Sequence, residues 1–265
     1  MMDCWYPEKS SNLPVVLFAH GFKGFKDWGH FHLIAQHFAH SGFAFLKMNF
    51  SHNGTSVQKP TEFEDLEAFG QNNFTRELGD LGDVINLIHN RKFELHDAID
   101  PDKLFLLAHS RGGGIALIKA SEEPRVKAIA TFAAVNNLIN LVNEDIMKQW
   151  KKNGVRYIYN TRTNQKMPMY YQIAEDALAN TERLNIHKAV MKLGNKQLII
   201  HGTNDETLPL TMANVMQFWN PKAEKLIIQG ANHTFGGYHP YDGNRLPEHT
   251  RVAADAAIKF FKSKL

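Results

Sequence analysis

The sequence predicts an α/β protein with a mostly parallel central sheet and helices on both faces. Apolar runs of strand length alternate with amphipathic stretches of helix length through most of the chain, as in crossover units on a parallel sheet. A chain of 265 residues with 43% hydrophobic content is long enough to bury one sizeable core. We therefore expect residues 1–265 to form a single domain.

The expected strands are short, and most contain enough β-branched or aromatic residues to be buried on both faces. They are Val15–Ala19, Ala44–Asn49, Leu104–His109, Ala128–Ala133, Gln197–His201 and Lys225–Ile228.

Between these strands, apolar residues recur at helical spacing, and Gly42 supplies a stop after the first such stretch. The expected helices are Trp28–His40, Leu78–His89, Gly113–Ser121, Thr211–Phe218 and Glu248–Lys262.

The stretch from about residue 136 to 190 breaks this rhythm. It is polar and rich in Asn and Lys, and it carries many aromatic and methionine side chains. No repeat or low-complexity tract accompanies it. We interpret it as an insertion into the α/β pattern rather than a linker.

Composition excludes several classes of function. Thirty basic residues against 27 acidic ones, without a Lys/Arg block, argue against a nucleic-acid or membrane-surface partner. Cys4 is the only cysteine, so one chain can form neither a disulfide nor a cysteine-based metal site. Without a signal-peptide run or a membrane-length apolar segment, a soluble, cytoplasmic protein is expected.

A serine stands at a strand-to-helix turn after the Leu104–His109 strand. Residues 108–114 read Ala-His-Ser-Arg-Gly-Gly-Gly, a relaxed form of GxSxG with Ala108 in the place of the first glycine. A nucleophile on such a strained turn needs small residues two positions before and after it, and Ala108 and Gly112 satisfy this. Ser110 is therefore the candidate nucleophile, with a helix N-cap as its alternative role.

A glycine turn also follows the strand Val15–Ala19, in the sequence His20-Gly21-Phe22-Lys23-Gly24. Acyl transfer requires two preorganised N–H donors for the developing oxyanion. We assign these donors to the backbone amides of Phe22 and Arg111. His20 is a competing general base, but a histidine before glycine in such a turn is expected to hold the shape of the loop.

Two later strands end in loops that carry titratable residues. Asp205 lies a few positions after Gln197–His201, and His233 lies a few positions after Lys225–Ile228. Because loops at the carboxyl ends of parallel strands open on one face, Ser110, Asp205 and His233 can converge there. Imidazole would activate the serine hydroxyl, and the carboxylate would orient the imidazole. Asp205 and His233 as ordinary loop residues are the alternative.

Five segments together resemble the α/β-hydrolase family, over nearly the whole chain. The resemblance is to the branch of dienelactone-hydrolase-like, prolyl-oligopeptidase-like and cinnamoyl (feruloyl) esterases. The segments are HGF at 20–22, NFSHNGTS at 49–56, AHSRGG at 108–113, HGTNDETLP at 201–209 and GANHTF at 230–235.

The resemblance implies hydrolysis of a small-molecule ester without a cofactor, with residues 136–190 as a small cap over the pocket. We expect one or two N-terminal edge strands of the family pattern to be absent, and no propeller domain to precede the hydrolase core. An aminopeptidase or amidase, an acyltransferase and a thioesterase use the same side chains and stay open. So do a catalytically silent binding module and a homodimer.

A metal site is the least favoured alternative. Histidines 30 and 32, or 37 and 40, lie close together at a predicted helix start, but no convincing carboxylate or third ligand accompanies them. We expect no metal and no cofactor.

Overall fold

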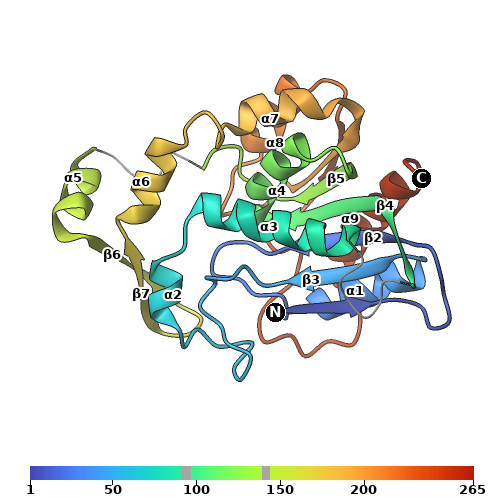
Figure 1. Cartoon of the computed structure of the whole chain (residues 1–265), viewed down its shortest axis with the longest axis horizontal. Helices are drawn as coiled ribbons and strands as arrows, with labels where there is room; N and C mark the ends of the chain where they lie inside the picture. The colour runs from blue at the N-terminus through green and yellow to red at the C-terminus, as the bar shows by residue number, and fades with distance from the viewer. Residues whose placement is uncertain (91–96, 139–143) are drawn as a thin grey trace.

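The computed structural model describes residues 1–90, 97–138 and 144–265. In this part of the chain, a seven-stranded sheet has the order β1-β3-β2-β4-β5-β8-β9 (Figure 1). All neighbouring strands are parallel except β1, which is antiparallel to β3. The strands are β1 (Met2–Trp5), β2 (Leu13–Ala19), β3 (Ala44–Met48), β4 (Ile99–His109), β5 (Val126–Phe132), β8 (Gln197–Gly202) and β9 (Glu224–Ile228).

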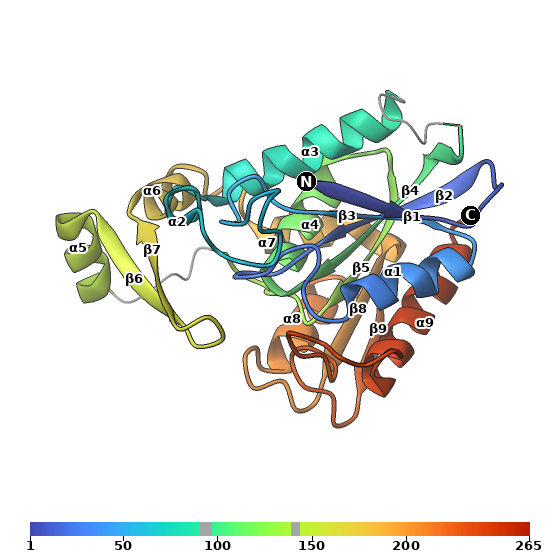
Figure 2. The same cartoon turned by 90° about the horizontal axis from the view of Figure 1, so that it is seen from below.

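Helices cover both faces of this sheet, as Figure 2 shows from below. Apolar side chains of β2 alternate between two cores: Val15 and Leu17 join the core on one face, and Val16 and Phe18 join the other. The first face carries α3 (Phe74–His89), α4 (Ser110–Glu122), α7 (Ile186–Leu193) and α8 (Thr211–Trp219), and the second carries α1 (Phe31–His40) and α9 (Glu248–Lys262). Two further short elements are the helix α2 (Leu66–Gly70) and the 3₁₀ turn η1 (Gly194–Lys196).

The predicted fold class is confirmed, and each of the six predicted strands is present within one or two residues or as part of a longer strand. Helix boundaries differ more. The first helix begins at Phe31 rather than Trp28, because Gly29 has a φ of 53°, which no α-helix accommodates. Helix α3 begins earlier than predicted, where the side chain of Asn73 accepts a hydrogen bond from the Arg76 amide as an N-cap.

Strand β1 is an N-terminal edge strand that the sequence did not predict. It pairs with β3 from Met2 to Trp5, and Asp3 on it forms ion pairs with Lys26 and Lys47. Four residues that include a charged side chain give too weak an apolar signal to predict a strand. The expectation that one or two edge strands of the family pattern are absent from the N-terminus stays a prediction.

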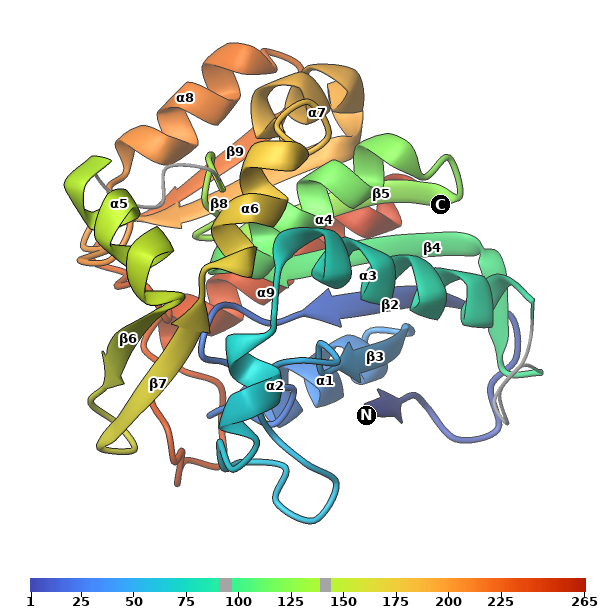
Figure 3. The same ribbon diagram turned by 60° about the vertical axis from the view of Figure 1, so that its left-hand side comes forward.

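Part of the segment 136–190 forms a separate antiparallel hairpin of β6 (Val155–Asn160) and β7 (Gln165–Tyr170), with α5 (Glu144–Asn153) before it and α6 (Gln172–Ala179) after it. Residues 139–143 of the predicted insertion lie outside the described residues. The Trp150 indole N–H donates to the Met169 carbonyl at 2.8 Å and ties α5 to the hairpin. Figure 3 shows the hairpin beyond the carboxyl ends of the parallel strands, rather than over a face of the sheet.

Candidate active site

Ser110 lies at a strained turn between β4 and α4. Its φ is 55°, in the left-handed region that a residue with a side chain rarely adopts. The helix begins at Ser110 itself and has no side-chain cap, so the serine does not serve as an N-cap. The strain points to a role for the hydroxyl at the turn.

Two glycines let the backbone approach this turn closely. A Cβ atom on Gly112 would lie 2.2 Å from the carbonyl oxygen of His20, and one on Gly21 would lie 3.0 Å from Cβ of Ser110. The first turn of α4 and the loop after β2 are therefore in direct contact. This contact is the physical reason for the small residue two positions after Ser110.

Three loops bring together the side chains that the sequence singled out. Nε2 of His233 lies 3.1 Å from Oγ of Ser110, and Nδ1 of His233 lies 2.9 Å from Oδ2 of Asp205. Asp205 follows β8 and His233 follows β9, and both loops reach the carboxyl edge of the sheet beside the end of β4. A hydrogen-bonded chain of hydroxyl, imidazole and carboxylate thus forms, in which Ser110 and His233 are 123 positions apart in the sequence.

The Asp205 carboxylate is fully buried and heavily hydrogen-bonded. Its Oδ1 accepts from the amides of Thr207 and Leu208 at 2.9 and 2.8 Å, while His201 and His233 approach Oδ2. Burial by itself would raise the pKa of Asp205, but these donors outweigh burial and hold its pKa well below the ordinary range. The group is therefore an anion at neutral pH.

His109, directly before the nucleophile, supports the position of His233. Its Nε2 donates to the His233 carbonyl oxygen at 3.0 Å, and the two rings are 4.8 Å apart. Burial lowers the pKa of His109 to about 3, with a further contribution from the charge of His233. A neutral His109 in the Nε2–H form can therefore hold this hydrogen bond at neutral pH. The sequence alone did not suggest a role for this residue.

The two amides assigned to the oxyanion lie in the contact between the loop after β2 and α4. The Arg111 amide is in the first turn of α4, where N–H groups have no partner within the helix. No acceptor for the Phe22 amide is present among the described residues. Neither amide has a backbone acceptor in the described part of the chain, and their oxyanion role stays a prediction.

His20 is positioned to shape that loop and not to take a proton from Ser110. Its Nδ1 donates to the Gly21 carbonyl at 2.9 Å, and its Nε2 accepts from the Phe50 amide at 3.4 Å. Burial lowers the pKa of His20 to about 4. Both ring nitrogens are thus committed to backbone groups.

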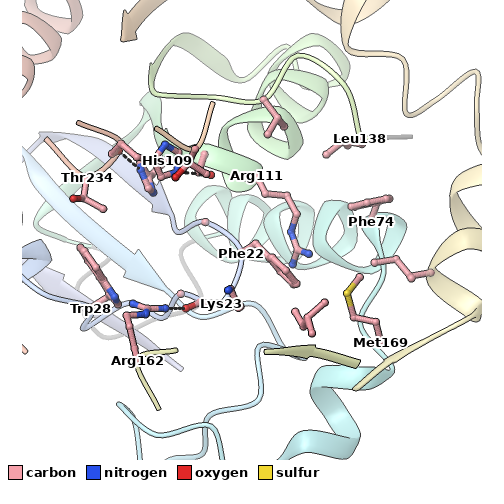
Figure 4. Close-up of a pocket in the computed structure, with 18 of the residues that line it drawn as sticks. Phe22, Lys23, Trp28, Phe74, His109, Arg111, Leu138, Arg162, Met169 and Thr234 are labelled. Atoms are coloured by element: carbon pink, nitrogen blue, oxygen red, sulfur yellow. Dashed lines mark hydrogen bonds between the residues drawn. The ribbon is translucent and has the colours of Figure 1, made fainter. Parts of the chain in front are cut away.

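A cavity of about 630 Å³ opens at Ser110 and His233 (Figure 4). Phe74, Leu138 and Met169 give one end an apolar lining, whereas the other end carries Trp28, Lys23 and Arg162. The hairpin β6–β7 contributes Ile158, Arg162 and Met169 to the wall. The volume suits a small organic substrate.

The Arg111 side chain also faces the cavity, and its charge is balanced by a buried carboxylate. Its Nη2 donates to Oε1 of Glu77 at 2.5 Å, and Asn72 donates to the same oxygen at 2.8 Å. The guanidinium carbon lies 4.2 Å from the centre of the Phe22 ring. Burial raises the pKa of Glu77, although Arg111 counteracts this effect. Arg111 and Glu77 are 34 positions apart in the sequence, and no sequence pattern predicts that they form an ion pair.

The histidines near α1 have other partners. His30 Nε2 contacts the Thr250 hydroxyl at 3.0 Å, and His37 Nε2 lies 2.6 Å from an Asp255 oxygen. No group of three or more His, Cys, Asp or Glu side chains suited to a metal ion occurs among the described residues. The described helices also include none that is long and apolar enough to cross a membrane.

Comparison with known proteins agrees with this architecture. The chain superimposes on Est1E from Butyrivibrio proteoclasticus with bound ferulic acid, with a TM-score of 0.74, 16% identity and coverage of 100% of this chain and 94% of that one. A monoacylglycerol lipase of Paleococcus ferrophilus has a TM-score of 0.68 at 13% identity, covering 100% and 99%. The esterase Est2 of Thermogutta terrifontis, with bound butyrate, has a TM-score of 0.64 at 15% identity, covering 99% and 88%.

At these identities the structural likeness establishes the fold alone. No protein with a curated description matches the sequence significantly. The family model described as "alpha/beta hydrolase fold" matches residues 14–168, more than half of the chain. The match includes β2 with its following loop, the turn at Ser110 and most of the hairpin β6–β7. The chain therefore belongs to the alpha/beta hydrolase fold family.

Proposed function

We propose that the protein is a serine esterase that cleaves carboxylic esters through an acyl-enzyme intermediate. The observation that carries the proposal is the continuous hydrogen-bonded chain from Ser110 Oγ through His233 to Asp205, with contacts of 3.1 and 2.9 Å. Its hydroxyl end lies in the wall of a cavity large enough for a small ester. The arrangement supplies a nucleophile, a base and an anion that orients the base.

The chemistry follows from these contacts. Oγ of Ser110 attacks the acyl carbon while its proton passes to Nε2 of His233, and the carbonyl π electrons move to oxygen, where the Phe22 and Arg111 amides stabilise the charge. Collapse of the tetrahedral intermediate breaks the bond to the alkoxy group, which takes the proton from His233 and leaves as an alcohol. Water then repeats the sequence on the acyl-serine, which releases the acid and restores the hydroxyl.

Asp205 has an orienting role in this scheme. Because its carboxylate is buried and anionic, it holds the proton on Nδ1 of His233 and leaves Nε2 free to accept the serine proton. It also stabilises the imidazolium that forms during each proton transfer.

The hairpin β6–β7, with α5 and α6, acts in our proposal as a cap on a single catalytic domain. Three hairpin residues line the cavity, which favours a position of the acyl or alcohol group between the hairpin and the carboxyl edge of the sheet. Esterases and a lipase among the similar structures favour an ester over an amide or thioester as the scissile bond.

A fluorophosphonate probe and p-nitrophenyl acetate test the proposal directly. The wild-type protein is expected to be labelled and to release p-nitrophenol, and Ser110→Ala is expected to lose both activities. Thermal unfolding of Ser110→Ala checks that the variant is folded. A folded wild-type protein that is neither labelled nor active would favour a catalytically silent binding module.

Assays with an aryl amide and an acyl thioester of matched acyl group distinguish the alternatives within this reaction class. A kcat/KM for the amide or thioester that exceeds the value for the ester would replace the esterase assignment with an amidase or thioesterase that uses the same side chains.

A further inference from the structure

The charges that line the cavity are all of one sign. Its described lining includes Lys23, Arg111 and Arg162, but no Asp or Glu. Arg111 is neutralised by its ion pair with Glu77. Lys23 and Arg162 have no carboxylate partner among the described residues. The cavity therefore carries about two uncompensated positive charges close to the proposed nucleophile.

The fold holds these two cations at the same end of the cavity. Lys23 directly follows Phe22 in the loop after β2, and Arg162 lies in the turn between β6 and β7. Nη2 of Arg162 donates to the backbone carbonyl of Lys23 at 2.5 Å, and its guanidinium carbon lies 5.5 Å from the centre of the Trp28 ring. Figure 4 shows Lys23, Trp28 and Arg162 grouped together, away from the apolar end.

Bringing two like charges together is unfavourable unless something compensates them. Burial lowers the pKa of Lys23, and the nearby charge of Arg162 lowers it further. Burial also lowers the pKa of Arg162. An anion bound between the two side chains would relieve both effects.

A purely structural role explains only part of this arrangement. The hydrogen bond from Arg162 to the Lys23 carbonyl can fasten the hairpin to the loop, but it uses one of the five N–H donors of the guanidinium. It gives no role to the ammonium group of Lys23. In addition, Nε1 of Trp28 at the same end is buried and has no hydrogen-bond partner among the described residues. This indole N–H, the Lys23 ammonium and the other N–H groups of Arg162 thus have no protein acceptor in the described structure at this end of the cavity.

We propose that this end of the cavity is an anion subsite that binds a free carboxylate of the ester substrate, with Lys23 and Arg162 as its ligands. The apolar end, with Phe74, Leu138 and Met169, would hold an aliphatic or aromatic body. The substrate class is then an ester that carries a carboxylate in addition to the scissile bond. This inference rests on the proposed esterase function.

Two matched pairs of esters test the subsite on either side of the scissile bond. The first pair carries the charge on the acyl side: p-nitrophenyl hydrogen adipate and its neutral methyl ester, p-nitrophenyl methyl adipate. The second carries it on the alcohol side: 4-acetoxybenzoate and methyl 4-acetoxybenzoate. In at least one pair we expect kcat/KM to be about tenfold or more higher for the anion at low salt, since charge-assisted hydrogen bonds are among the stronger ones.

The variants Lys23→Met and Arg162→Gln remove one charge each and approximately keep side-chain length. Each is expected to reduce the anion-to-neutral ratio of kcat/KM severalfold, and the double variant should bring the ratio close to one. Lys166→Gln is the matched control, because Lys166 is an exposed cation on the same hairpin that does not line the cavity. It should keep the wild-type ratio.

Direct binding separates the subsite from catalysis. Calorimetric titration of Ser110→Ala with monomethyl adipate and dimethyl adipate should show tighter binding of the carboxylate. That advantage should be lost in the Lys23→Met/Arg162→Gln background and weakened by added salt.

The outcomes distinguish this inference from the proposed function. Ser110-dependent hydrolysis without a preference for the anion in either pair would overturn the subsite and leave the esterase intact. An unchanged ratio in the double variant would overturn the assignment of Lys23 and Arg162. If no ester is hydrolysed, the proposed function fails, and the titrations still decide the subsite: equal affinity for the two adipates would overturn it.

Discussion

Nε2 of His201 lies 3.3 Å from Oδ2 of Asp205, and both side chains are completely shielded from solvent. The same Nε2 lies 3.0 Å from the carbonyl oxygen of Leu208. An N–H at Nε2 of His201 is therefore shared between the Leu208 carbonyl oxygen and the Asp205 carboxylate. His201 lies near the end of β8, shortly before the loop that carries Asp205. A second histidine thus helps to fix the carboxylate that orients His233 in the proposed mechanism.

Replacing Asp205 by Asn is the sharpest test of that orienting role. We expect kcat with p-nitrophenyl acetate to fall by about 10³ to 10⁴, since an amide in place of the carboxylate favours the wrong tautomer of the catalytic histidine. The fold should be retained, as thermal unfolding would show. Asp255→Asn is the matched control, because Asp255 is a partly exposed carboxylate that also pairs with a histidine, His37.

Full activity in Asp205→Asn would mean that another carboxylate orients His233. In the described structure Asp205 is the carboxylate in contact with His233, so such a result would contradict the geometry as well as the mechanism.

The strands and the three proposed catalytic loops could be predicted because their signals are local. An apolar run of strand length followed by a turn that contains glycine is legible in sequence, and parallel topology then brings the turns to one edge. Ser110, Asp205 and His233 satisfied all of these conditions. The distances between them still required the structure.

What the sequence missed depends on tertiary contacts. His201, His109 and Glu77 acquire their roles only from burial beside a partner distant in space, and each looks ordinary in its own segment. The hairpin β6–β7 was missed because aromatic side chains such as Tyr157 and Tyr159 lie on its exposed face, where the alternation of buried apolar and exposed polar residues that marks a strand is lost. For His109 a usable signal existed, since it adjoins the predicted nucleophile.

Buried histidines should make stability depend on pH, and His20 and His30 are two of them. Burial lowers the pKa values of His20 and His30 to about 4 in the folded protein, from an ordinary value of 6.5. Between these values the unfolded chain binds protons that the folded chain does not, so the free energy of unfolding falls as the pH drops from about 6.5 toward about 4. Each group contributes a slope of up to about 1.4 kcal/mol per pH unit.

Urea unfolding at several pH values between about 7 and about 4.5 measures this slope. His30→Gln should reduce it by up to about 1.4 kcal/mol per pH unit, whatever its effect on stability at neutral pH. His40→Gln is the control, because His40 is exposed at the end of α1. A slope in His30→Gln equal to that of the wild type would show that His30 is protonated in the folded state.

Gly112 should not tolerate even a methyl group. Because its Cβ would lie 2.2 Å from the His20 carbonyl oxygen, Gly112→Ala must push α4 away from the loop after β2. We expect a loss of roughly 1–3 kcal/mol in the free energy of unfolding, the usual cost of overpacking. Under conditions where Gly112→Ala is still fully folded, its esterase activity should already be reduced. The same shift separates the amides of Phe22 and Arg111.

Gly79→Ala, in the neighbouring helix α3, is expected to raise stability where Gly112→Ala lowers it. Gly79 lies inside α3 with nothing within 4 Å of the point that a Cβ atom would occupy, and alanine is the better helix former. This variant should gain up to about 1 kcal/mol and keep its activity. Equal behaviour of the two variants would refute the steric argument for Gly112.

The ion pair of Arg111 and Glu77 predicts an asymmetry between single and double variants. Glu77 is 1% exposed and Oε2 of its carboxylate has no hydrogen-bond partner among the described residues, so Arg111→Met leaves an anion buried without its cation. We expect this variant to lose about 3–5 kcal/mol of stability, the range for breaking a buried pair from one side. The double variant Arg111→Met/Glu77→Leu removes the unpaired buried charge, and its free energy of unfolding should fall less than that of Arg111→Met.

Chemical denaturation of both variants at neutral pH measures this difference. A double variant that is less stable than Arg111→Met would show that packing of the Glu77 side chain, rather than its charge, dominates this site.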